Sequence, residues 1–158
     1  MILVLAGTNP YPFTRLLRAV DEWSRSSGEH VIAQSGHTPV EGLVIEIHPF
    51  VSHAQILEWI AQADVVICQG GLGSLRDCLR AGKPTVAVPR KPELGESQDI
   101  QSELVEALVQ EGKVIGVDNI AHLAQAIDQA RSMPIRKGEE SRIPQIVADK
   151  IHSILGLA

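Results

Sequence analysis

The chain has 158 residues, 44% of them hydrophobic and 21% charged, a balance typical of one folded domain and not of a disordered segment. Aromatic residues make up only 3%, so we expect an aliphatic core of the kind found where helices cover a sheet. The net charge of −5 argues against a general nucleic-acid-binding or anionic-membrane surface.

Short apolar runs rich in valine and isoleucine alternate along the chain with stretches of helical period. The runs are typical of strands buried on both faces, at 2–6, 30–34, 43–47, 64–68, 84–88 and 113–117. Apolar residues recurring at i, i+3 and i+4 predict helices over 13–25, 53–62, 101–111 and 119–131, and another helix begins near Ser74. Because parallel neighbours need crossover helices, this order predicts an α/β fold, a doubly wound, Rossmann-like parallel sheet with helices on both faces.

We expect residues 1–132 to form this domain and residues 133–158 to form a linker and a C-terminal helix. The stretch 131–144 is charged and interrupted by proline and glycine, which favours a flexible connection. Beyond it, an apolar stripe predicts an amphipathic helix over 143–155, formed by Ile143, Ile146, Val147, Ile151, Ile154 and Leu155. Such a helix either packs on its own domain or docks on a partner.

Cysteine usage and the chain's apolar runs indicate a cellular compartment. Cys68 and Cys78 lack metal-ligand spacing, so we expect buried thiols in a reducing cytoplasm. The N-terminal stretch has no basic region before its five apolar residues, and it predicts a first strand, not a signal peptide. No run approaches the ~18 apolar residues needed to span a bilayer, so we expect a soluble, cytoplasmic protein.

Two loops rich in small residues, "AGTNPYP" at 6–12 and "QGGLGS" at 69–74, follow the first and fourth predicted strands. In a strand order of the 3-2-1-4-5-6 kind these strands are adjacent at the switch point, where open parallel sheets bind ligands. Glycines there let backbone N–H groups approach an anion, and the next helix offers its unpaired amides. Ser74 can cap that helix or bind a phosphate oxygen, and Asp77 can bind ribose hydroxyls. Glycines that only permit a tight turn explain the loop equally well.

Motifs for metal chemistry are absent from the sequence. No D-x-D occurs, and the six histidines form no H-x-x-x-H pair, so we expect no metal site. His37 and His53 lie near predicted strand ends, where either could have a pocket role, although a solvent-exposed loop histidine is the explanation that we favour.

Three segments, 5–22, 49–90 and 95–115, carry motifs in the order of one known family. They resemble the UDP-sugar-binding C-terminal domain of glycosyltransferase family 28, most closely its small stand-alone members. Those members are bacterial capsule and exopolysaccharide transferase subunits and the eukaryotic subunit that adds the second N-acetylglucosamine to dolichol-linked sugar. The chain departs from the family in having Asp77 where a glutamate is common and Ile100 where a histidine is common.

The resemblance implies a donor site but identifies no catalytic residue. The backbone at Phe50 and Val51 would meet uracil, and Asp77 would bind ribose. Further residues would contact the diphosphate and the sugar: Gly7, Thr8, Gly70, Gly71, Gly73, Ser74, Arg90, Glu96 and Gln101. A solvated loop explains Arg90 and Lys91 equally well.

The resemblance also implies an activity and a partner. The chain would be one half of a GT-B fold, the donor-binding subunit of an inverting, metal-independent glycosyltransferase that needs no cofactor besides its UDP-sugar. A membrane-associated acceptor subunit would complete it and recruit it to the membrane's inner face, in polysaccharide or lipid-linked oligosaccharide synthesis. A non-catalytic nucleotide-sugar-binding module remains an alternative. A plain nucleotide-binding fold is a third, but it leaves the Gln101 segment unexplained.

Overall fold

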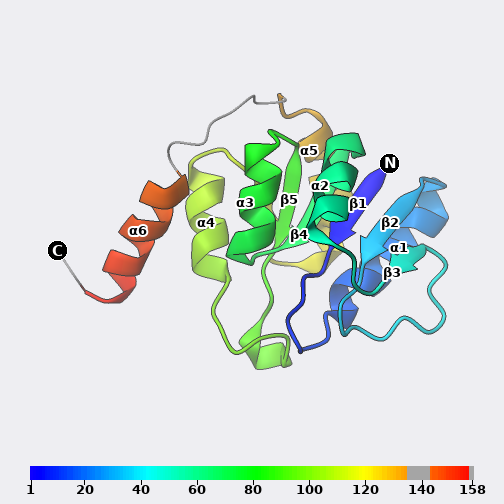
Figure 1. The fold of residues 1–158 in the computed structure, drawn as a ribbon, viewed down its shortest axis with the longest axis horizontal. Helices are drawn as coiled ribbons and strands as arrows, with labels where there is room; N and C mark the ends of the chain where they lie inside the picture. The colour runs from blue at the N-terminus through cyan, green and yellow to red at the C-terminus, as the bar shows by residue number, and fades with distance from the viewer. Residues whose placement is uncertain (135–142, 157–158) are drawn as a thin grey trace.

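The computed structural model describes residues 1–134 and 143–156, and its centre is a six-stranded parallel sheet (Figure 1). The strand order is β3-β2-β1-β4-β5-β6, so β1 and β4 are neighbours and the predicted doubly wound topology is confirmed. Leu5 near the end of β1 pairs with Cys68 of β4, which brings the loops that follow these strands together. The strands are β1 (Ile2–Leu5), β2 (Val31–Gln34), β3 (Glu46–His48), β4 (Val65–Gln69), β5 (Thr85–Val88) and β6 (Ile115–Gly116).

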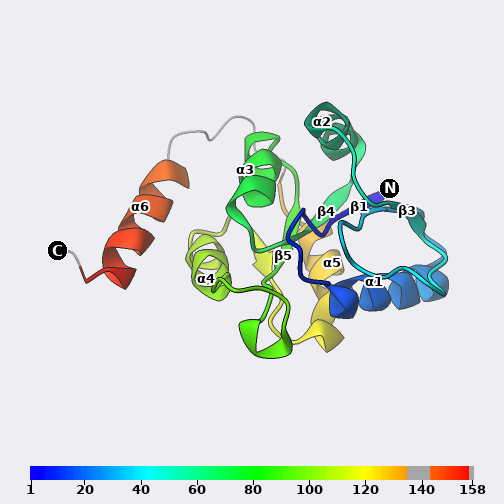
Figure 2. The same cartoon turned by 60° about the horizontal axis from the view of Figure 1, so that its bottom comes forward.

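Helices cover both faces of the sheet (Figure 2). One face carries α1 (Thr14–Ser27) and α5 (Leu123–Arg131), whose apolar stripes pack on alternate residues of the strands. The other face carries α2 (His53–Gln62), α3 (Leu72–Arg80) and α4 (Ser102–Gln110). Two short 3₁₀ helices, η1 (Pro92–Leu94) and η2 (Ile120–His122), lie in connections.

The starts of β3 and α3 are among the element boundaries that differ from the sequence-based prediction. The third strand begins at Glu46 instead of residue 43, because the backbone N–H groups of Val44 and Ile45 donate to the buried carboxylate of Asp21 and not to a strand. Helix α3 begins at Leu72, with Gly71 as N-cap and no side-chain cap. The predicted capping role of Ser74 is therefore wrong, since Ser74 already lies inside the helix.

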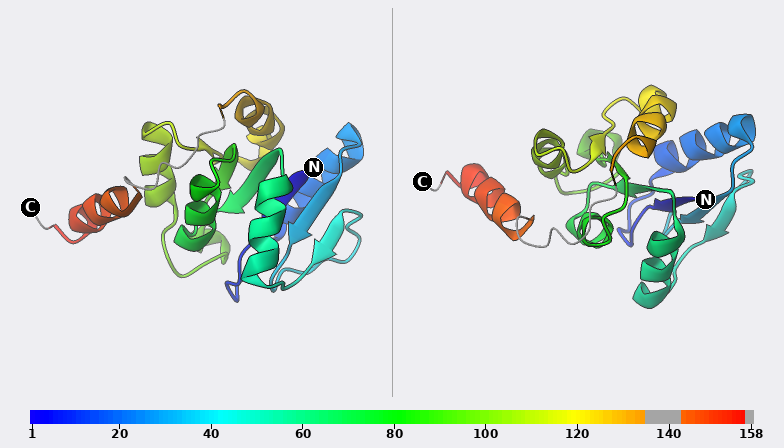
Figure 3. Two further views of the ribbon diagram at one scale, coloured as in Figure 1. Left: turned by 45° about the horizontal axis from the view of Figure 1, so that its top comes forward. Right: turned by 90° about the horizontal axis from the view of Figure 1, so that it is seen from above.

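The C-terminal helix α6 (Ile143–Ile154) lies at one end of the molecule beside α4 (Figure 3). Its Ile146 is buried in the same apolar cluster as Val105 and Leu108 of α4. Ile151 and Leu155, in contrast, are exposed. The predicted linker falls mainly on residues 135–142, outside the described residues, and the division into domain and appended helix remains a prediction.

The two cysteines are fully buried, as predicted. The neighbouring thiol of Cys78, together with burial, raises the pKa of Cys68, so this thiol is protonated at neutral pH. Within the described parts of the chain, no helix has both the length and the apolarity needed to cross a membrane.

Candidate functional site

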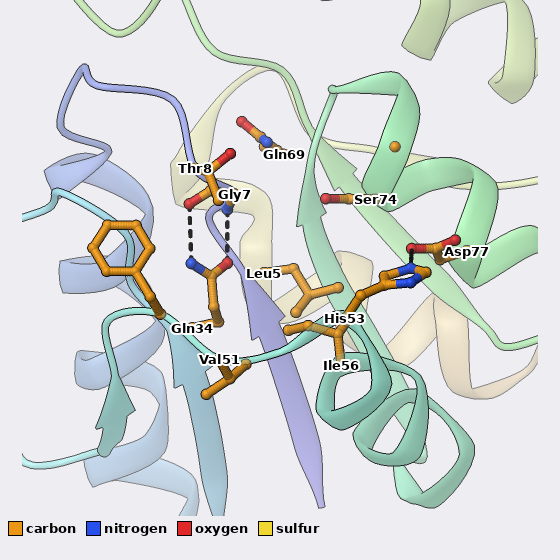
Figure 4. A pocket seen from close by; sticks show the side chains of 12 residues that line it. Leu5, Gly7, Thr8, Gln34, Val51, His53, Ile56, Gln69, Ser74 and Asp77 are labelled. Atoms are coloured by element: carbon orange, nitrogen blue, oxygen red, sulfur yellow. Dashed lines mark hydrogen bonds and ion pairs between the residues drawn. The ribbon is translucent and has the colours of Figure 1, made fainter.

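A cavity of about 330 Å³ opens at the carboxyl ends of β1 and β4, the edge of the sheet at which the sequence predicts a ligand site (Figure 4). Its walls come from the loop after β1, the end of β2, the start of α2, and the β4–α3 connection. The lining residues are Leu5, Gly7, Thr8, Gln34, Phe50, Val51, His53, Ile56, Gln69, Gly73, Ser74 and Asp77. The cavity therefore joins segments that are far apart in the sequence.

The predicted donor-site residues divide into two groups in the structure. The group that lines this cavity consists of Gly7, Thr8, Phe50, Val51, Gly73, Ser74 and Asp77. The other group lies outside the cavity lining and consists of Gly70, Gly71, Arg90, Glu96 and Gln101. Four further lining residues, Leu5, Gln34, Ile56 and Gln69, were not named as site residues from the sequence, and His53, considered there only as a possible pocket residue, also lines the cavity. The two glutamines end buried strands, and a polar residue at that position is the signal that was overlooked.

Gln34 holds the loop after β1 in place. The Gly7 N–H donates to Gln34 Oε1 at 3.0 Å, and Gln34 Nε2 donates to the carbonyls of Gly7 and Pro49 at 3.0 and 2.9 Å. Gly7 has φ +78°, and a Cβ added there would lie 1.8 Å from Gln69 Nε2. Both backbone conformation and space therefore require glycine at this position.

The glycines of the β4–α3 loop differ in whether the surrounding atoms leave space for a side chain. A Cβ at Gly70 would lie 2.9 Å from Gln101 Cβ, and one at Gly71 would lie 3.1 Å from Gln69 Nε2. Packing within the protein thus accounts for these two. Gly73 has no left-handed φ, and a Cβ there would meet no described atom within 4 Å. No side chain of the described residues covers the Gly73 backbone on the side of the cavity. A ligand can therefore approach this backbone closely.

The N-terminus of α3 points its first amides toward the cavity wall. No side chain caps this end, so these N–H groups stay available to an anion. Ser74 lies in the first turn and lines the cavity beside them (Figure 4). Amides, a hydroxyl and the positive end of the helix dipole make this wall suited to a phosphate group.

One turn further along α3, Asp77 forms a pair with His53 of α2 on the same side of the cavity (Figure 4). His53 Nε2 lies 2.8 Å from Asp77 Oδ2. The imidazole is 65% exposed, whereas the carboxylate is only 10% exposed. His53 is exposed, as favoured from the sequence, but it is the first residue of α2 and not a loop residue, and the alternative of a place in the cavity lining is the one that the structure shows.

Arg90 lies behind the cavity and is 2% exposed, so the solvated-loop alternative is wrong for this residue. Burial lowers the pKa of Arg90 to about 10, partly opposed by the charge of Glu96, and the guanidinium stays protonated at neutral pH. Glu96 is itself buried and accepts two hydrogen bonds from Arg15. Gln101 Oε1 accepts the Arg90 backbone N–H at 2.9 Å. Their contacts with a donor sugar remain predictions.

The fold and site agree with a known family. Residues 1–153 match the family model of the glycosyltransferase family 28 C-terminal domain. The chain belongs to this family. No curated protein matches its sequence significantly.

Solved structures share the fold of this family 28 domain at low identity. The glycotransferase of kitacinnamycin is 19% identical with a TM-score of 0.66, over 98% of this chain and 39% of that one. UDP-GlcNAc 2-epimerase from Methanocaldococcus jannaschii is 16% identical with a TM-score of 0.60, over 94% of this chain and 45% of that one. The solution structure of ALG13 is 15% identical with a TM-score of 0.62, over 98% of this chain and 96% of that one. The expected architecture, one half of a GT-B fold, is confirmed, and the chain spans less than half the length of the first two proteins.

Four exposed apolar side chains of this family 28 domain lie along the edge of the sheet at which the cavity opens, and one of them, Phe50, lines the cavity. Phe50, Leu72, Leu94 and Ile100 are 53, 44, 57 and 65% exposed. All four lie in segments that follow carboxyl ends of strands, or at the start of the next helix, on the side where the cavity opens. Apolar groups gathered at such a rim are typical of a surface that another protein covers. Among the described residues, no group of three or more histidine, cysteine, aspartate or glutamate side chains is placed to hold a metal.

Proposed function

We propose that this family 28 domain binds a UDP-sugar and supplies the donor half of an inverting, metal-independent glycosyltransferase. The observation that carries the proposal is the cavity itself, in which α3 presents an uncapped N-terminus, the bare backbone of Gly73 and, one turn later, the Asp77 carboxylate. A fold neighbour supports it. M. jannaschii UDP-GlcNAc 2-epimerase in complex with UDP-GlcNAc and UDP is 15% identical with a TM-score of 0.59.

Each part of the nucleotide can be assigned to cavity residues of matching chemistry. The diphosphate lies at the α3 amides and Ser74, where N–H and O–H donors meet its negative charge. The ribose hydroxyls donate to Asp77, and the backbone at Phe50 and Val51 meets the uracil. In the reaction an acceptor hydroxyl attacks the anomeric carbon, the bond from that carbon to the diphosphate oxygen breaks, and UDP leaves. The α3 amides stabilise the charge that develops on the departing oxygen, without a metal ion.

A partner supplies the acceptor side and the catalytic base. The first two fold neighbours continue well beyond the part that this chain matches, whereas ALG13 is matched over nearly its whole length. The apolar rim at Phe50, Leu72, Leu94 and Ile100 offers a surface for such a partner. We propose a membrane-associated acceptor subunit that recruits the domain to the inner face of the membrane for polysaccharide or lipid-linked oligosaccharide synthesis.

Calorimetric titration with UDP and a panel of UDP-sugars tests the donor proposal. We expect binding in the presence of EDTA, with the same affinity after Mg²⁺ is added. No heat with any nucleotide, or binding only with Mg²⁺, would contradict the proposal. Transfer assays with the isolated chain and with its partner then separate the alternatives. Activity only with the partner supports a two-subunit enzyme, whereas donor binding without transfer in either case indicates a non-catalytic module.

A further inference from the structure

The guanidinium of Arg90 ties together the loops behind the cavity. Its Nε donates to Gln69 Oε1 at 2.6 Å, and its Nη2 donates to the Ala6 carbonyl at 2.6 Å. Its Nη1 donates to the carbonyls of Tyr11 and Glu96, both at 2.8 Å. Arg90 thus connects the ends of β1 and β4 with the loop after β5, and none of its bonds reaches into the cavity.

These contacts settle which way the Gln69 amide points. A guanidinium can only donate, so the atom that faces Arg90 is the amide oxygen of Gln69. The amide nitrogen must then face the loops of Gly7 and Gly71, whose added Cβ atoms would lie 1.8 and 3.1 Å from it. Within residues 1–134 and 143–156, Gln69 Nε2 has no hydrogen-bond acceptor, and Gln69 lines the cavity. The Gln69 Nε2 amide group is therefore an oriented hydrogen-bond donor that is available to a ligand.

The charge behind this amide is positive. Arg15 makes a two-pronged pair with the Glu96 carboxylate, at 2.8 and 2.9 Å. Arg90 bonds Glu96 only at the backbone carbonyl, so the Glu96 carboxylate pairs with Arg15 and the Arg90 guanidinium has no carboxylate partner among the described residues. In a buried setting the remaining positive charge acts over a longer range than it would in water.

We propose that the Gln69 amide donates a hydrogen bond to a diphosphate oxygen of the bound nucleotide, and that Arg90 is the positioning residue that orients and polarises this amide. The inference rests on the proposed nucleotide site and names a further contact within it. The arrangement delivers positive charge to the diphosphate without placing a cationic side chain in the cavity. The anionic leaving group is then stabilised by a preorganised donor with a charge behind it.

The test compares UDP with uridine, which lacks the diphosphate, in full-length variants. Gln69→Glu keeps an oxygen for Arg90 but replaces the cavity-facing NH₂ with carboxylate oxygen, whereas Gln69→Met removes both polar atoms at similar size. We expect Gln69→Met to weaken UDP binding roughly tenfold and Gln69→Glu to weaken it further, because the carboxylate repels phosphate. Uridine binding, followed by NMR titration, stays unchanged in both.

Arg90→Lys tests the positioning step, because lysine keeps the charge but cannot form the guanidinium fork. We expect a lower UDP-to-uridine affinity ratio in this variant and no further decrease when it is combined with Gln69→Met. Asp21→Asn is the matched control. It weakens a buried ion pair on α1, remote from the cavity lining, and should lower stability while leaving the ratio unchanged.

The outcomes separate the two proposals. If the wild-type chain binds no UDP, the proposed function fails. If it binds UDP and a folded Gln69→Glu variant binds UDP as tightly as wild type does, the Gln69 contact fails while the proposed function stands. If Arg90→Lys does not fold, the Gln69→Glu and Gln69→Met pair still decides the contact. A fall in uridine affinity equal to the fall in UDP affinity also overturns the inference, because it indicates a purely structural role.

Discussion

His53 Nε2 and Asp77 Oδ2 lie 2.8 Å apart, so a helix-starting imidazole holds the carboxylate proposed to bind ribose. Asp77 comes from α3 and His53 from α2, and the contact joins the two helices across the mouth of the cavity. The bond occupies one carboxylate oxygen. The other has no hydrogen-bond partner among the described residues and can accept from a ligand hydroxyl.

Replacing Asp77 with alanine should weaken UDP binding by ~1–3 kcal/mol, because a ribose hydroxyl loses its acceptor. Calorimetry with UDP and 2′,3′-dideoxy-UDP measures the effect. Wild type should prefer UDP, and Asp77→Ala should bind the two nucleotides about equally. His53→Ala leaves the acceptor in place and serves as the control, with a smaller loss. If folded Asp77→Ala binds UDP as tightly as wild type does, Asp77 has no role in nucleotide binding and only pairs with His53.

Gly73→Ala separates the two explanations of the glycine loop. The added Cβ meets no described atom and lies in a helix, so alanine should stabilise the fold by about 0.5–1 kcal/mol. We expect UDP binding to weaken at least tenfold, since the methyl group occupies the space into which the phosphate must come. Thermal unfolding and calorimetry measure the two effects.

Gly28→Ala is the control variant for the Gly73→Ala prediction. Gly28 ends α1 with φ +73° and open space around it, so alanine there should destabilise the fold without touching the cavity. Gly73→Ala should therefore raise the free energy of unfolding, whereas Gly28→Ala should lower it. Equal UDP affinity in Gly73→Ala and wild type would mean that the glycine serves the turn alone.

Asp21 should make stability depend on pH on the acid side. Burial opposes its ionised form, but hydrogen bonds from Arg25 and from the backbone of Val44 and Ile45 outweigh burial and lower its pKa. A lowered pKa stabilises the folded state above the unfolded-state value of about 4, and this contribution is lost as pH falls through the folded-state pKa. Asp21→Asn should therefore be about 1–3 kcal/mol less stable at pH 7, with a smaller difference below pH 4. Urea unfolding at both pH values measures the difference, and a gap that stays constant would refute the assignment.

Truncation after Pro134 tests the role of α6. We expect the truncated protein to stay folded and bind UDP normally, with a stability loss of about 1.5–3 kcal/mol from exposing the surface that Ile146 covers. We expect α6 to add a second contact with the acceptor subunit beside the apolar rim, so the truncated protein should co-elute with that subunit less than the full chain does. Ile151→Ser in the full chain is the sharper variant, because this side chain is exposed and its loss should weaken the complex alone. A truncated chain that unfolds would make α6 an integral part of the domain.

The order of elements and the location of the site followed from local signals in the sequence. Valine- and isoleucine-rich runs and the i, i+3, i+4 stripes are properties of short windows, and parallel strands with right-handed crossovers leave few topologies. The switch point between β1 and β4, and with it the place of Gly7, Ser74 and Asp77, could therefore be predicted.

Pairings between distant side chains were decided only by the tertiary structure. His53 meets Asp77 across 24 positions and Arg90 meets Gln69 across 21, and no periodic pattern marks either pair. The start of β3 depends on Asp21, which takes backbone donors from a segment 23 positions away. A short stretch of sequence shows which residues are apolar and where the chain turns. It cannot record which polar side chain a buried donor will reach, because that depends on how the strands are ordered and the helices packed.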